Sequence, residues 1–132
     1  MQYRRMGKTE LEISQISFGA LQLGRVALKD VNKMVDYALE KGINYIDTAR
    51  VYGKSEEKLG KALAGRREDV IISTKVISRN LNSFRKDLEI SMDNLCTNYI
   101  DILFNHDVST LAEWEQLNNN GVLEFMKEKQ KE

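Results

Sequence analysis

The fold is decided by residues 43–76, which read INYIDTARVYGKSEEKLGKALAGRREDVIISTKV. Apolar and β-branched residues gather at both ends of this stretch, and they predict strands at 43–48 and 70–76. The central part predicts a helix over about 55–65, because Ser55 is a favourable N-cap residue and two glutamates follow it in the first turn. A helix between two strands is typical of a βαβ unit, in which the strands run parallel.

The same alternation of strands and helices continues on both sides of this unit. Short apolar runs predict the strands, and apolar residues at the spacing of one helix face predict the helices. The further predicted elements are a hairpin turn at 6–9, a strand at 16–20, a helix at 31–39 stopped by Gly42, a helix at 84–95, a strand at 99–106, and a helix at 111–131 broken at 118–121. The order is therefore a hairpin followed by four βα units.

Two parallel architectures fit this order, an open doubly wound sheet and a closed (β/α)8 barrel. A complete barrel has about 250 residues, and this chain has 132. We therefore expect a parallel (β/α)8 TIM-barrel type of fold, here about the first four βα units with an N-terminal β-hairpin. The expected organisation is a single truncated domain over residues 1–132. A Rossmann domain is disfavoured, because the glycines between Gly19 and Gly24 do not have the Gly-x-Gly-x-x-Gly spacing.

Composition excludes several classes of protein. The 20 basic and 20 acidic residues cancel, so overall charge predicts neither a nucleic-acid partner nor a membrane surface. No apolar run has the length of a membrane span, and the basic residues near Met1 are not followed by the apolar segment of a secretory signal. Cys96 is the only cysteine and cannot form an internal disulfide, so we expect a reducing, cytoplasmic setting. We expect no metal site.

Ionisable residues stand at the ends of three consecutive predicted strands. Asp47 ends the strand at 43–48, Lys75 lies at the end of the next, and His106, the only histidine, ends the last one; Tyr52 lies in the loop just beyond Asp47. Each of these residues alone is explained as a turn, packing or surface residue. Together they are better explained as a site, because the carboxyl ends of parallel strands share the face on which active sites are built.

These four side-chain types can perform one specific reaction together. A phenol with its ordinary pKa of about 10 is a weak acid at neutral pH. An adjacent ammonium favours the phenolate, and a carboxylate can hold that ammonium in place. An imidazole can orient a carbonyl and share in proton transfer. The set is suited to protonating an alkoxide as hydride reaches a carbonyl carbon, and the hydride would come from a nicotinamide cofactor.

Several segments share their order and spacing with one known family. They are YRRMGKT at 3–9, IDTARVYG at 46–53, SEEKLG at 55–60, STKV at 73–76, and YIDI at 99–102 with the histidine that follows it at 106. With these motifs the chain resembles the aldo-keto reductases over essentially all of its residues. The resemblance implies a (β/α)8 barrel whose bottom is closed by the N-terminal hairpin.

The resemblance also implies a role for each residue of the candidate site. It makes Tyr52 the general acid, Lys75 the neighbour that lowers the pKa of the phenol, Asp47 the partner of that lysine, and His106 the group that orients the carbonyl. The implied reaction is the reduction of an aldehyde or ketone, a small-molecule carbonyl substrate, by NADPH or NADH. Arg50 departs from the family pattern, because many members have proline there.

The implied cofactor contacts are fewer than a complete family member would have. The backbone of Gly19, Ala20 and Leu21 falls where the family approaches the nicotinamide and substrate, and Asp47 lies beside it. The family holds the rest of its cofactor with loops after later strands, which this sequence does not contain. The alternative is a non-enzymatic half-barrel that acts as an interaction module. Its open edge could pair with a second copy to form a homodimer.

Overall fold

A parallel sheet forms the centre of the structure, a computed structural model that describes residues 1–131. Its four strands lie side by side in chain order, and every neighbouring pair is parallel. They are β3 (Phe18–Gly19), β4 (Tyr45–Asp47), β5 (Ile71–Val76) and β6 (Ile102–Asn105). The expected parallel βα order is confirmed, although each strand is shorter than the sequence pattern predicts.

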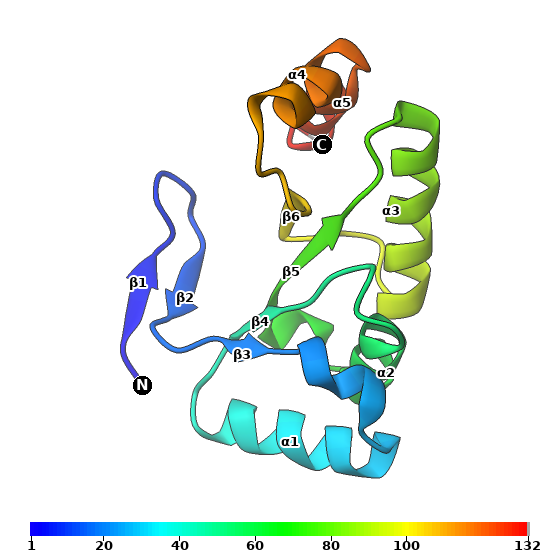
Figure 1. Ribbon diagram of the computed structural model, residues 1–132. Coiled ribbons are helices and arrows are strands. Elements are labelled where there is room, and N and C mark those ends of the chain that lie inside the picture. Colours follow the sequence, from blue (N-terminus) through cyan, green and yellow to red (C-terminus); the bar gives the residue numbers. More distant parts are fainter. Residues whose placement is uncertain (132) are drawn as a thin grey trace.

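Helices follow the strands along the chain and cover one face of the sheet (Figure 1). In chain order they are the 3-10 helix η1 (Leu21–Arg25), α1 (Leu28–Glu40), α2 (Ser55–Ala62), the 3-10 helix η2 (Arg67–Asp69), α3 (Leu81–Leu95), α4 (Leu111–Asn119) and α5 (Val122–Lys129). The predicted break in the last helix is confirmed at Gly121, which adopts a left-handed conformation with φ of +74°. None of the helices within residues 1–131 combines the length and apolar character needed to cross a bilayer.

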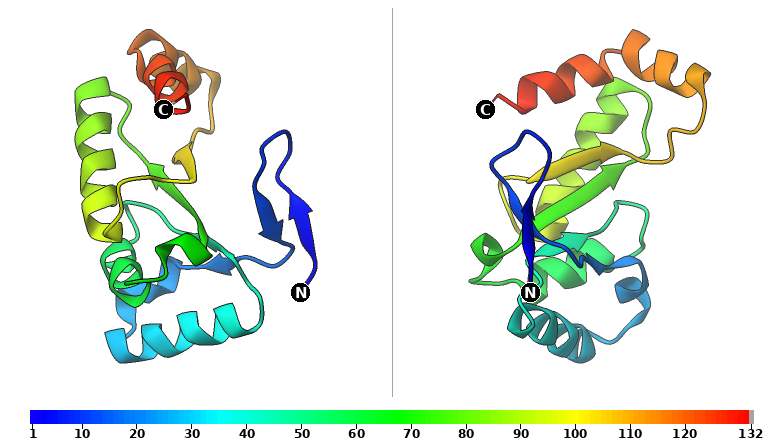
Figure 2. Two further views of the ribbon diagram at one scale, coloured as in Figure 1. Left: turned by 180° about the vertical axis from the view of Figure 1, so that it is seen from behind. Right: turned by 90° about the vertical axis from the view of Figure 1, so that its left-hand side faces the viewer.

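The N-terminal hairpin stands apart from these helices, beside the amino end of β3 (Figure 2). It consists of β1 (Tyr3–Arg5) paired antiparallel with β2 (Glu12–Ser14), as the turn at 6–9 predicts. Asn44 anchors it, because its side chain accepts from the Ser14 N–H at 2.7 Å and donates to the Glu12 carbonyl at 2.9 Å. Asn44 directly precedes β4, so the hairpin is fixed at the amino end of the strands.

Two clusters of buried apolar side chains hold the layers together. The first joins the early strands to α1 and α2 around Val35, Ile46 and Leu59, none of which has exposed surface. The second joins β5 to α3, α4 and α5 around Phe84 and Leu117. In α1 the predicted apolar face is buried at Val31, Val35 and Ala38, whereas Met34 is 42% exposed.

α2 starts at Ser55, as the sequence predicts, but Ser55 does not have the predicted capping role. Ser55 is the first helical residue and not the N-cap, a position that Lys54 occupies without a side-chain hydrogen bond. The Ser55 hydroxyl instead donates to the Ala20 carbonyl at 2.8 Å and lies 3.0 Å from the Thr48 hydroxyl. The helix begins where it does because its first turn is bonded to two neighbouring loops.

Asn80 caps α3, and its removal gives a first test of the fold. Its side-chain oxygen accepts from the backbone N–H groups of Asn82 and Ser83 at 3.0 and 3.3 Å. We expect Asn80→Ala to lower the free energy of unfolding by about 1 kcal/mol, since it leaves these N–H groups without their cap. Asn82→Ala is the control, because Asn82 is exposed in the same turn and contributes only its backbone. Equal effects of the two substitutions in urea denaturation would contradict the capping role.

Candidate active site

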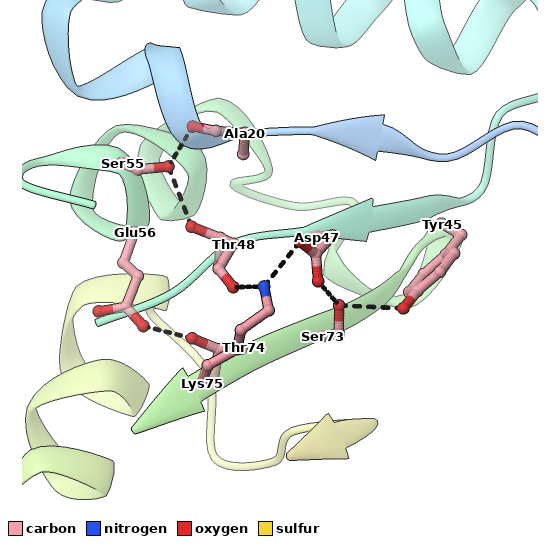
Figure 3. Close-up of polar contacts among 9 residues, drawn as sticks. All are labelled: Ala20, Tyr45, Asp47, Thr48, Ser55, Glu56, Ser73, Thr74 and Lys75. Atoms are coloured by element: carbon pink, nitrogen blue, oxygen red, sulfur yellow. Dashed lines mark hydrogen bonds and ion pairs between the residues drawn. The ribbon is translucent and has the colours of Figure 1, made fainter. Parts of the chain in front are cut away.

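An ion pair between Lys75 and Asp47 lies at the carboxyl end of β4 and β5. The Lys75 Nζ donates to Asp47 Oδ2 at 2.6 Å, and to the Thr48 carbonyl at 2.7 Å (Figure 3). The other oxygen of Asp47 accepts from the Ser73 hydroxyl at 2.5 Å, and that hydroxyl accepts in turn from Tyr45 at 3.1 Å. Both oxygens of the carboxylate are thus engaged, and the ammonium is held in one place.

The rings of Tyr52 and His106 lie beside this ion pair. The Lys75 Nζ is 5.2 Å from the centre of the Tyr52 ring. The imidazole of His106 meets the same ring edge to face, with the two ring centres 5.9 Å apart and their planes at 86°. The structure therefore brings together the four predicted site residues, here called the tetrad: Asp47, Tyr52, Lys75 and His106. They come from the ends of three neighbouring strands and the loop after β4.

His106 is positioned through its backbone. Its N–H donates to the Val76 carbonyl at 2.9 Å, and its own carbonyl accepts from Arg79 Nη2 at 2.7 Å. Arg79 also donates to the Asp107 carbonyl at 2.9 Å, so the loop after β5 grips the loop after β6. The Nδ1 atom of His106 is buried and has no hydrogen-bond partner within residues 1–131. The ring is therefore oriented by packing and by its backbone.

The three residues predicted to approach the cofactor differ in accessibility. Ala20 is fully buried, its N–H donates to the Asp47 carbonyl at 2.8 Å, and its carbonyl accepts from Ser55. Gly19 and Leu21 on either side of it are exposed. Ala20 therefore fastens the loop to β4, while Gly19 and Leu21 have backbone or side-chain surface available to a ligand.

Some residues of the site have no signal in the sequence that singles them out. Arg79 belongs to this group, because its bonds to carbonyl groups depend on how two loops meet in space. Ser73 could have been found, since it stands two residues before Lys75 and so shares its face of β5.

The arrangement places an ammonium and an imidazole beside a phenol. An ammonium beside a phenol favours transfer of the phenolic proton, because the phenolate that remains lies next to a positive charge. The imidazole packed against the phenol ring is a second group that can donate or accept a proton. The side chains of Lys75 and Asp47 are 19% and 31% exposed. The pair therefore lies at the accessible carboxyl end of the strands and not in the apolar core.

Comparisons with known proteins agree with this geometry. Residues 15–132 match the sequence profile of the Aldo/keto reductase family. The chain is 31% identical to the uncharacterized oxidoreductase YqkF of Bacillus subtilis, with 95% of the chain and 47% of that protein aligned. It is 36% identical to L-galactose dehydrogenase of Arabidopsis thaliana, over 82% of the chain and 39% of that enzyme.

Solved structures give the same result. Aldo-keto reductase AKR11C1 of Bacillus halodurans, in its holo form, superposes with a TM-score of 0.74 at 31% identity, covering 92% of this chain and 48% of that one. The four-stranded unit corresponds to part of a TIM barrel. The chain spans between 39% and 48% of the length of these relatives.

A double-mutant cycle measures how strongly the ion pair of the site is coupled. We expect Asp47→Asn and Lys75→Met to show a coupling energy of about 1–2 kcal/mol in chemical denaturation, because both groups are largely shielded from water. The control pair is Glu57 and Lys61, which are joined at the same 2.6 Å but are 43% and 53% exposed. A coupling no larger than that of the control would show that the pair is no better than a surface contact.

Proposed function

The chain belongs to the aldo/keto reductase family, and on this premise we propose that it carries the proton-transfer half of an NAD(P)H-dependent reduction of an aldehyde or ketone. One observation carries the proposal. The Lys75 ammonium, held by Asp47 at 2.6 Å, lies 5.2 Å from the ring of Tyr52, and His106 packs against that same ring. This is the set of groups needed to protonate a carbonyl oxygen.

The residues beside the tetrad fit a nicotinamide. Gly19 lies opposite Asp47 in the sheet register and is exposed, and a Cβ atom built on it would meet no atom within 4 Å. A flat ring can therefore approach the backbone next to the carboxylate. We propose that Gly19 and Leu21 contact the cofactor, with Asp47 beside them, and that Ala20 supports them from within. When bound, NADPH or NADH supplies the hydride.

The proposed reaction divides the remaining work among four side chains. Tyr52 donates its phenolic proton to the carbonyl oxygen of the substrate. Lys75 favours this transfer because its positive charge stabilises the phenolate that Tyr52 becomes. Asp47 holds the ammonium in place, and His106 orients the carbonyl toward the phenol. The substrate class is a small aldehyde or ketone.

Two further points belong to the proposal. We propose one domain over residues 1–132, which contributes one part of a complete catalytic barrel. We also propose a cytoplasmic setting. It is supported by the single cysteine, Cys96, which is a free and exposed thiol and is typical of a reducing compartment.

Replacement of the proposed acid tests the mechanism. Tyr52→Phe removes the phenolic proton and keeps the ring, so we expect the rate of carbonyl reduction to fall about 10²–10⁴-fold with little effect on NADPH binding. The measurement is NADPH oxidation with a panel of aromatic and aliphatic aldehydes. Tyr37→Phe is the control, since Tyr37 lies 62% exposed on α1 and its loss should leave the rate unchanged. Near wild-type turnover in the Tyr52 variant would contradict the role of Tyr52 as the general acid.

A second candidate function is self-association through the open side of the sheet. The observation that favours it is Phe104, which is 42% exposed on β6, at the edge of the sheet. It lies opposite Lys75 in the register, so a second copy bound there would cover the candidate site as well as the edge.

Light scattering on the eluting peak of a size-exclusion column tests this candidate. A homodimer would have twice the chain mass of 15.2 kDa. We expect Phe104→Lys to shift a dimer toward the monomer, because it places a charge in the buried part of the interface. Tyr37→Lys, at an exposed position on the helical side, should leave the mass unchanged. A wild-type chain that is monomeric at all concentrations tested would rule the candidate out.

A further inference from the structure

The ammonium of Lys58 is bound entirely by main-chain carbonyl groups. Its Nζ donates to the carbonyls of Leu23, Gly24 and Val26 at 3.2, 2.8 and 2.6 Å. A lysine has three N–H donors and no acceptor, so this cage of three carbonyls satisfies the group completely. The carbonyls belong to the end of η1 and the residue after it, where the carbonyl end of a helix attracts a cation. The Leu23 carbonyl also accepts from the Val26 N–H at 3.1 Å.

The caged loop is pressed against the backbone of Tyr52. A Cβ atom placed on Gly24 would lie 2.7 Å from the Tyr52 carbonyl oxygen and 3.3 Å from the Lys54 nitrogen. Such an approach leaves space only for glycine. The same carbonyl of Tyr52 accepts from the Ser55 N–H at 3.1 Å. The position of the Tyr52 backbone is therefore set between η1 on one side and the start of α2 on the other.

The first turn of α2 holds the other end of the same loop. The buried Ser55 hydroxyl donates to the Ala20 carbonyl and contacts the Thr48 hydroxyl (Figure 3). Lys58, one turn later on the helix, holds residues 23–26. The loop from Ala20 to Val26 is thus fastened at both ends by a single helix, and that helix follows directly on the loop that carries Tyr52.

We propose that Lys58 is a positioning residue for Tyr52. By caging the carbonyls of η1 it keeps Gly24 against the Tyr52 backbone, and so sets the phenol relative to Lys75 and His106. The inference rests on the proposed function for its catalytic meaning, because Tyr52 is there the general acid. The geometric part stands by itself, since it concerns where one ring lies and what holds it.

The single histidine of the chain gives a direct readout of this geometry. His106 contributes the only imidazole resonances in a proton NMR spectrum, and the Tyr52 ring, 5.9 Å away and edge to face, shifts them through its ring current. We expect Lys58→Met to move the His106 Hε1 and Hδ2 resonances. Lys61→Met is the matched control, because it removes the same charge from the same helix at a residue that pairs with exposed Glu57.

Amide hydrogen exchange locates the cause. The N–H groups of Leu23 and Val26 are bonded within the loop, to the carbonyls of Ala20 and Leu23. We expect Lys58→Met to speed their exchange about tenfold or more, with no comparable change at Ile72 in β5, since the cage acts on the loop alone. Uniform acceleration at all three amides would mean that Lys58 has only a general stabilising role, and would overturn the proposal.

A second variant decides the matter if Lys58→Met fails to fold. Gly24→Ala forces the loop away from the Tyr52 carbonyl and leaves the cation in place, so it should also move the His106 resonances. The proposal is overturned if a folded Lys58 or Gly24 variant keeps the wild-type resonances, or if the Lys61 variant moves them equally. None of these readouts needs cofactor or turnover. A chain that shows the shifts but reduces no carbonyl compound would retain the positioning role and lose the proposed function.

Discussion

The parallel register between β4 and β5 is the constraint on which the rest of the site depends. Asp47 lies opposite Ser73, so the carboxylate reaches both the serine hydroxyl and, two residues further along the same face, the ammonium of Lys75. Side chains alternate between the faces of a strand, and a slip of one residue would turn Lys75 toward the helices. The proposed roles of the Tyr52 ring and the His106 imidazole depend on an ammonium held in this way.

The outer face of the same strands is fastened by α2. Glu56 is fully buried in the first turn of this helix, and its carboxylate accepts from the hydroxyl of Thr74 at 2.7 Å. Thr74 directly precedes Lys75, so the two neighbouring residues tie β5 to the helix layer on one side and to Asp47 on the other. A buried carboxylate is costly to keep, and its place at a helix N-terminus offsets part of that cost. One helix thus supports the site from behind, through Glu56, and from the side, through Lys58.

Much of the fold and of the candidate site could be predicted from the sequence. The contacts that could not be predicted have physical reasons for leaving no pattern in it. The alternation of strand and helix patterns predicts the parallel sheet, and the ends of the strands identify Asp47, Lys75 and His106, because chain order and strand direction are enough to gather them. The start of α2 at Ser55 was predicted correctly, but the role of Ser55 was predicted wrongly, because its hydroxyl bonds to two neighbouring loops and Lys54 holds the N-cap position. Lys58 reads as an ordinary surface lysine, since its partners are backbone carbonyls that carry no residue identity.

We propose above all that the gathered side chains form a site for carbonyl reduction next to a nicotinamide. The measurement that tests this proposal most directly is a titration of the purified chain with NADPH, in which the nicotinamide fluorescence is followed and Gly19→Val serves as the matched variant. The account predicts saturable binding that weakens in the variant, because its side chain would occupy the open space beside Asp47. A nicotinamide fluorescence that shows no saturable binding at any NADPH concentration would contradict the claim that these residues receive the cofactor.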